Sequence, residues 1–156
     1  MPFANVELPS IFLTRRVGSV TPEETAAMVT RLRKVLSEAT SPCVVVYDAG
    51  HDPSGRPDAR SRQHFATLFA DEDGLLRKRC AGIDCAFPSP LSRGVLTAVL
   101  WVKSPPIGTH VHASCRDAVR AAVARASSKA DVDGLVKALD DAAAAVRADG
   151  KTARTA

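Results

Sequence analysis

Short apolar runs alternate along this chain with segments whose apolar residues recur at helical spacing. The runs, which are typical of strands, cover residues 11–17, 43–47, 79–87 and 109–113. The segments with helical spacing cover residues 21–39, 58–78, 89–102, 115–126 and 129–147. This alternation predicts an α/β domain with a single mostly parallel sheet and helices packed on it. The strand at 11–17 could lie antiparallel at an edge of that sheet.

The ends of two predicted helices carry separate signals. Thr21, Pro22 and Glu24 predict a helix start with a capping box: threonine caps, proline suits the first helical position, and glutamate follows three residues after the cap. Ser114 and Asp117 have the same spacing and predict the start of a later helix. These signals support the helix boundaries independently of the apolar pattern.

The pattern also predicts how deeply some elements are buried. Residues 43–47 are apolar without alternation, which is typical of a strand covered on both faces. Cys80 and Cys85 are an odd number of residues apart, so a regular strand sends their side chains to opposite faces. The helix at 89–102 is apolar around most of its circumference and is expected to be the most buried helix.

The last predicted helix has an apolar stripe with a period of about 3.5 residues. The stripe consists of Val132, Leu135, Val136, Leu139, Ala142, Ala143 and Val146. It is expected to pack on the domain itself; left uncovered, it could pair with the same helix of a second copy or with a partner. A single domain is therefore predicted at residues 1–150, with a mobile tail at 151–156.

Composition narrows the classes of function. The 156 residues suit one domain, and the apolar fraction of 46% and charged fraction of 24% are ordinary for a globular protein. The net charge of +4 is spread along the chain and aromatic residues make up 4%, a pattern that argues against nucleic-acid binding. No run reaches the roughly 18 consecutive apolar residues of a membrane span.

The cysteines and the N-terminal residues bear on location. Residues 1–10 lack the charged-then-apolar order of a signal peptide. The four cysteines lie in or beside apolar runs, which indicates buried free thiols in a reducing compartment. The cytoplasm is the predicted location.

Three segments resemble the SpoIIAA-like and STAS-like proteins, a group that includes anti-sigma-factor antagonists. They are residues 43–48 (CVVVYD), 79–90 (RCAGIDCAFPSP) and 92–101 (SRGVLTAVLW). The order of elements agrees from residue 11 to residue 126. The resemblance implies a four- or five-stranded sheet with helices mainly on one side, and a function exerted through protein contact.

The resemblance is incomplete at the position that regulates the better-known antagonists. In those proteins a serine or threonine at the start of the helix after the central strand is phosphorylated, which breaks the complex. Here the corresponding loop after residues 43–47 is longer and has no Asp-Ser pair followed by glycine. Ser54 lies in that loop and Ser61 in the first turns of the next predicted helix. Either could be modified, but neither matches the motif.

Polar residues follow two of the predicted strands and are expected at the same end of a parallel sheet. Asp48, His51 and Asp52 follow the run at 43–47, where they could form an acid/base cluster or simply solvate a loop. Ser89, Ser92 and Arg93 stand where a strand enters a helix, whose first turn could bind a phosphate or carboxylate. Ser89 is equally suited to be a plain cap, and Arg93 a surface residue. The predicted partner- or ligand-binding residues are Asp48, His51, Ser61, Ser89, Ser92 and Arg93.

Metal binding and catalysis receive less support. In a strand, His110 and His112 point to the same face, and Cys115 could fold back from the next helix. Zinc needs three or four ligands, however, and no Cys-x-x-Cys pair accompanies these residues. Cys115 starts a helix near His112, and a helix N-terminus and a histidine can both stabilise the thiolate of a nucleophilic cysteine. No third residue that would orient the pair is evident. The glycine-rich phosphate loop of nucleotide enzymes is absent. We therefore predict no catalytic residues, no metal and no cofactor.

The sequence as a whole favours a non-enzymatic regulatory domain that binds another protein, as a monomer or as a homodimer. One alternative is a small-molecule or lipid-binding module, because related α/β folds include the CRAL-TRIO lipid carriers. The other is an enzyme or metal protein that uses the histidine and cysteine residues.

Overall fold

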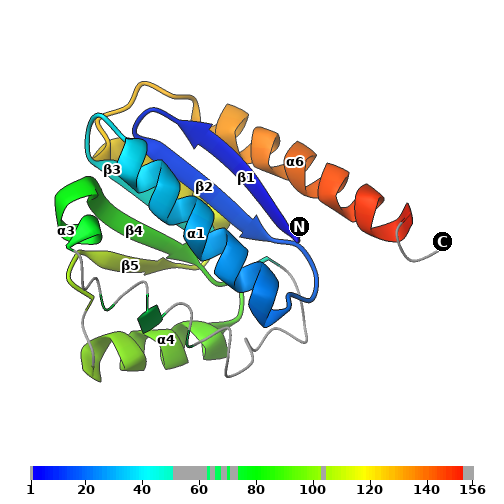
Figure 1. Cartoon of the computed structure of the whole chain (residues 1–156), viewed down its shortest axis with the longest axis horizontal. Coiled ribbons are helices and arrows are strands. Elements are labelled where there is room, and N and C mark those ends of the chain that lie inside the picture. The colour runs from blue at the N-terminus through cyan, green and yellow to red at the C-terminus, as the bar shows by residue number, and fades with distance from the viewer. Residues whose placement is uncertain are drawn as a thin grey trace.

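The computed structural model describes residues 2–50, 74–102 and 105–152, together with residues 63, 66, 67 and 70. Within this part of the chain, five strands form one sheet in the order β1-β2-β3-β4-β5 (Figure 1). Strand β1 is antiparallel to β2, and the pairs β2–β3, β3–β4 and β4–β5 are parallel. The predicted mostly parallel α/β fold is confirmed. The strands are β1 (Phe3–Leu8), β2 (Ile11–Arg16), β3 (Cys43–Asp48), β4 (Cys80–Ala86) and β5 (Thr109–His112).

The antiparallel edge strand is β1, which the apolar pattern did not predict. The expectation that residues 11–17 could form the antiparallel edge is therefore wrong: β2 is an internal strand that pairs with β1 on one side and β3 on the other. Polar Asn5 and Glu7 interrupt the apolar residues of β1 and hide its strand character. Leu8 pairs directly with Ile11, so the two strands form a tight hairpin.

The helices are α1 (Pro22–Glu38), α3 (Leu75–Arg79), α4 (Pro90–Val102), α5 (Cys115–Arg125) and α6 (Val132–Thr152). The capping box of α1 is confirmed: Thr21 Oγ1 accepts from the Glu24 backbone N–H at 3.2 Å, and Glu24 Oε2 accepts from the Thr21 N–H at 2.8 Å. Ser114 caps α5 as predicted. The final helix starts later than residue 129 and continues past Gly150 to Thr152. Most of the predicted helix at 58–78 lies outside the described residues, as do residues 153–156 of the predicted tail.

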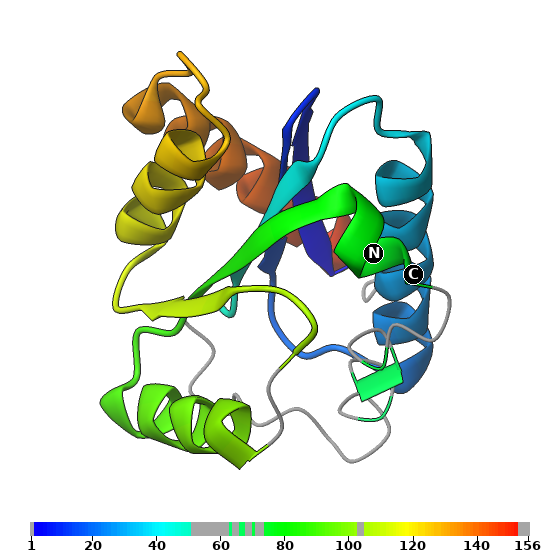
Figure 2. The same cartoon turned by 90° about the vertical axis from the view of Figure 1, so that its left-hand side faces the viewer.

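Helices cover both faces of the sheet, so the expectation of helices mainly on one side is wrong. In Figure 2 the sheet stands between α1 on one side and α5 and α6 on the other. Alternate residues of β3 enter the two cores, Cys43 and Val45 on the α1 side and Val44 and Val46 on the α6 side. The prediction that residues 43–47 form a strand covered on both faces is thereby confirmed.

The apolar stripe of α6 packs within the chain, as expected. Leu135, Leu139 and Ala143 are buried with Ala4 of β1 and Leu13 of β2 in the α6-side core. The stripe is therefore covered by the chain's own sheet together with helix α5.

Two cysteines depart from the predicted alternation along β4. Cys80 and Cys85 both belong to the α1-side core, although a regular strand would send them to opposite faces. The cause is a shift of register: Cys43 pairs with Cys80, whereas the next residue, Val44, pairs with Gly82. The extra residue, Ala81, resets the alternation.

Helix α4 is the largest departure from the sequence prediction. It lies beside the edge strand β5, apart from the helices that cover the two faces (Figures 1 and 2). None of its described side chains is buried, and Leu91 and Val95 are 66% and 58% exposed. The expectation that this helix is the most buried is wrong, because its position at the edge of the sheet leaves its outer side without a neighbouring element in the described part of the chain.

Replacing Thr14 with valine is expected to raise the free energy of unfolding by about 1 kcal/mol. The Thr14 hydroxyl is buried and has no hydrogen-bond partner among the described residues. Thr25→Val is the matched control, because the equally buried Thr25 hydroxyl donates to the Thr21 carbonyl and its loss should destabilise. Urea denaturation measures both changes. Destabilisation by Thr14→Val would show that this hydroxyl has a partner in solution.

Candidate functional site

The carboxyl ends of β2, β3, β4 and β5 meet at one edge of the sheet because these strands are parallel. Asp48 ends β3, and Ser89, Ser92 and Arg93 follow the end of β4. A backbone hydrogen bond of 3.0 Å from the Ala49 N–H to the Ala86 carbonyl joins these two ends. The predicted residues His51 and Ser61 lie outside the described residues, as do Asp52 and Ser54.

Asp48 is buried and is paired within the chain. Its Oδ2 accepts from Arg15 Nε at 2.6 Å, and its Oδ1 accepts from the Gly50 N–H at 2.9 Å. Arg15 also donates through Nη1 to Asp140 of α6. Burial by itself would lower the pKa of Arg15, but the hydrogen bond that Arg15 donates to Asp140 and the negative charge of Asp48 raise it above its ordinary value. Arg15 therefore joins Asp48 at the sheet edge to Asp140 of α6, and the Asp48 carboxylate is engaged within the chain.

Cys115 adjoins this ion pair at the first turn of α5. Its side chain lies close enough to Arg15 and Asp48 for both to influence its titration. Burial, and then the negative charge of Asp48, raise the pKa of the Cys115 thiol to about 11. A nucleophilic cysteine needs a lowered pKa, so the surroundings of Cys115 are the reverse of those that activate a thiol.

Alkylation of Cys115 by iodoacetamide in the folded protein is expected to have a pH midpoint near its pKa of about 11. Asp48→Asn should lower that midpoint, because it removes the negative charge that disfavours the thiolate. Peptide mapping by mass spectrometry at a series of pH values measures the rate. Asp141→Asn, which changes an exposed carboxylate paired with Lys137, serves as the control. A midpoint at an ordinary thiol pKa in the native chain would contradict the burial of this group.

Ser89 and Arg93 hold the turn that leads into α4. Ser89 Oγ accepts from the Ser92 N–H at 3.3 Å, as a helix cap does. Arg93 Nη1 donates to the carbonyls of Phe87 and Pro88, each at 2.8 Å. The guanidinium thus bonds the chain's own backbone. The contact of Ser89 matches its interpretation as a plain cap, whereas Arg93 is half-buried and bonded to the backbone and is therefore not the simple surface residue of the alternative interpretation.

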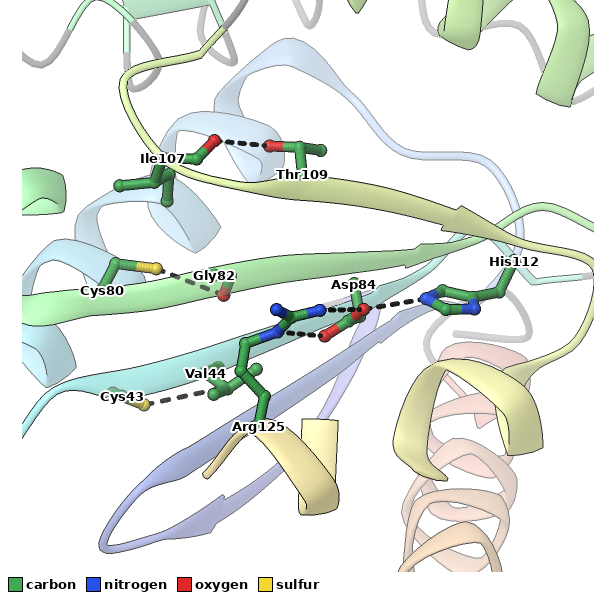
Figure 3. Close-up of polar contacts among 9 residues, drawn as sticks. All are labelled: Cys43, Val44, Cys80, Gly82, Asp84, Ile107, Thr109, His112 and Arg125. Carbon is green, nitrogen blue, oxygen red and sulfur yellow. Dashed lines mark hydrogen bonds and ion pairs between the residues drawn. The ribbon is translucent and has the colours of Figure 1, made fainter. Parts of the chain in front are cut away.

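A second polar cluster, which the sequence analysis did not single out, centres on Asp84 in the middle of β4. The Asp84 side chain is completely buried, and Figure 3 shows it between His112 and Arg125. Its Oδ1 lies 2.8 Å from His112 Nε2, and Arg125 donates to both carboxylate oxygens at 3.4 Å. The available signal was a charged residue inside an otherwise apolar run, since buried carboxylates require partners.

The histidine and cysteine residues considered for metal binding separate in the structure. His112 contacts Asp84, His110 is exposed, and Cys115 contacts Arg15 and Asp48. Within residues 2–50, 74–102 and 105–152, no group of three or more histidine, cysteine, aspartate or glutamate side chains is placed to hold a metal ion.

The position of Gly82 is linked to the Asp84 cluster. A Cβ atom at Gly82 would lie 2.8 Å from Cδ of Arg125, which is closer than such atoms can approach. The arginine side chain therefore passes over a residue that has no side chain of its own, and this allows it to reach Asp84.

The sequence matches no protein-family model and none of the curated proteins. A solved structure is similar, that of an uncharacterized protein from the DUF3478 family with a SpoIIAA-like fold, from Shewanella loihica PV-4. The match covers 77% of this chain and 91% of that chain, with a TM-score of 0.55 and 16% sequence identity.

The chain has a SpoIIAA-like fold. This confirms the resemblance that residues 43–48, 79–90 and 92–101 indicate, at the level of the fold. At 16% identity the similarity extends to the arrangement of strands and helices, and it does not identify a functional site. No helix in the described part of this SpoIIAA-like chain combines the length and the apolar character that crossing a bilayer requires.

Proposed function

We propose that this SpoIIAA-like domain is a regulatory module that binds another protein through α4 and performs no catalysis. The observation that carries the proposal is the exposure of Leu91 and Val95. In the described part of the chain these are the exposed large hydrophobic side chains, and they lie one helical turn apart on the same side of α4. Exposed apolar groups that gather on one surface are typical of protein interaction sites.

The electrostatics of α4 favour a protein partner with an apolar contact surface. Arg93 is the charged residue within Pro90–Val102, and its guanidinium bonds the Phe87 and Pro88 carbonyls. Gly94 and Ala98 are also exposed, and because Gly94 has no side chain and Ala98 only a methyl group, a neighbouring element can approach the helix closely. The outer side of α4 therefore offers apolar contact with little charge to desolvate.

The state of the polar groups supports binding over catalysis. Asp48 is paired with Arg15, Asp84 with His112 and Arg125, and the pKa of the Cys115 thiol is raised to about 11. Each group is engaged by another part of the same chain. A general base or nucleophile would need to be within reach of a substrate.

The test is partner recovery by a tagged protein that carries both Leu91→Ser and Val95→Ser. Proteins that the native chain retains should be lost, while the melting temperature stays close to the native value because both side chains are exposed. Lys34→Ser is the control, since it changes an exposed residue on α1, away from α4. Equal recovery by the native and doubly substituted chains would contradict the proposal. Arg93 is unsuitable for this test because its loss would also disturb the turn before α4.

The native chain and the doubly substituted chain also test for self-association and for the ligand-binding alternative. Sedimentation of the native chain at several concentrations would show a homodimer, and loss of that dimer on substitution of Leu91 and Val95 would identify the partner as a second copy. Native mass spectrometry of the purified protein would show a bound small molecule or lipid. A stoichiometric ligand that both native and substituted chains retain would favour the ligand-binding module.

We also propose a cytoplasmic location. Cys43, Cys80, Cys85 and Cys115 are free thiols, three of them buried. Reduced thiols of this kind are typical of reducing compartments. Fractionation of cells that express the native chain tests the location, and recovery outside the cytoplasm would contradict it.

A further inference from the structure

We draw no further inference here: the strongest candidate, the exposed apolar side of α4 around Leu91 and Val95, belongs to the surface already proposed for partner binding, and nothing in the structure shows what covers it.

Discussion

Replacing Asp84 with alanine is expected to lower the free energy of unfolding by about 3–5 kcal/mol. The carboxylate is completely buried and is the partner of both His112 and Arg125. Its removal leaves the two basic groups without the acceptor toward which they point, in a region largely withdrawn from water. Urea denaturation followed by circular dichroism measures the loss.

The matched control is Asp133→Ala. Asp133 forms an ion pair of 2.9 Å with Arg116, in which the two side chains are 66% and 55% exposed. Pairs of this kind contribute about 0–1 kcal/mol, so the control should differ little from the native chain. If Asp84→Ala lowered the free energy of unfolding as little as Asp133→Ala does, the assignment of a buried cluster whose members depend on one another would be contradicted.

A triple variant separates the effect of pairing from that of packing. Asp84→Met, His112→Leu and Arg125→Met together replace the whole cluster with apolar side chains. We expect this chain to be more stable than Asp84→Ala, because no basic group is left without its partner. If the triple variant were as unstable as Asp84→Ala, the effect of Asp84→Ala would come from disturbed packing around β4 and not from lost charge pairing.

Stability is expected to fall steeply as the pH rises above about 9. Burial raises the pKa of Cys43 to about 11 and that of Cys85 to about 12, from an ordinary value of 9.0. Their folded-state pKa values lie above the unfolded ones, so the stabilisation is fully present below pH 9 and is lost as the pH rises toward 11–12. Each thiol removes up to about 1.4 kcal/mol per pH unit in that window.

Urea denaturation at a series of pH values from neutral to strongly alkaline measures this slope. Cys85→Ala removes one of the titrating thiols, which also include Cys115 with its pKa of about 11, and should make the fall with pH shallower. The protein has a single tyrosine, Tyr47, whose pKa burial raises to about 12, so phenolate absorbance provides a second measurement on the same core. A free energy of unfolding that stays constant between pH 8 and pH 10 would rule out buried neutral thiols.

Local chemistry made some of the fold predictable. The capping box at Thr21 and Glu24 and the cap at Ser114 depend on residues within one helical turn, and both are confirmed. The run at 43–47 is apolar at every position, whereas a strand covered on one face would alternate apolar and polar residues. These features could be predicted because each is determined by a few adjacent residues.

Features that depend on distant parts of the chain were not predictable in the same way. The spacing of apolar residues in α4 predicts a helix with an apolar surface. It does not reveal that the helix lies beside the sheet, where nothing in the described chain covers Leu91. The shift of register at Cys43 arises from pairing between two strands and cannot be read from either alone.

The candidate site shows the same limit. The positions of Asp48 at the carboxyl edge of the sheet and of Ser89 and Arg93 at a helix entrance agree with the sequence prediction, and their part in binding stays a prediction. Their partners were not predictable, because Arg15 is 33 residues away from Asp48 and the Arg93 guanidinium turns to the backbone. Asp84 could have been selected, since a charged residue in an apolar run demands a partner.

The packing of α6 against β1 has a consequence for how the chain is made. Ala4 lies in the same core as Leu139 and Ala143, so strand β1 is covered by a helix that is synthesised much later than the strand itself. The core on the α1 side contains no residue of α6. The opposite face of the β1–β2 hairpin, in contrast, is covered only once α6 has been synthesised. During synthesis that face meets water, or a chaperone, until translation of α6 is complete.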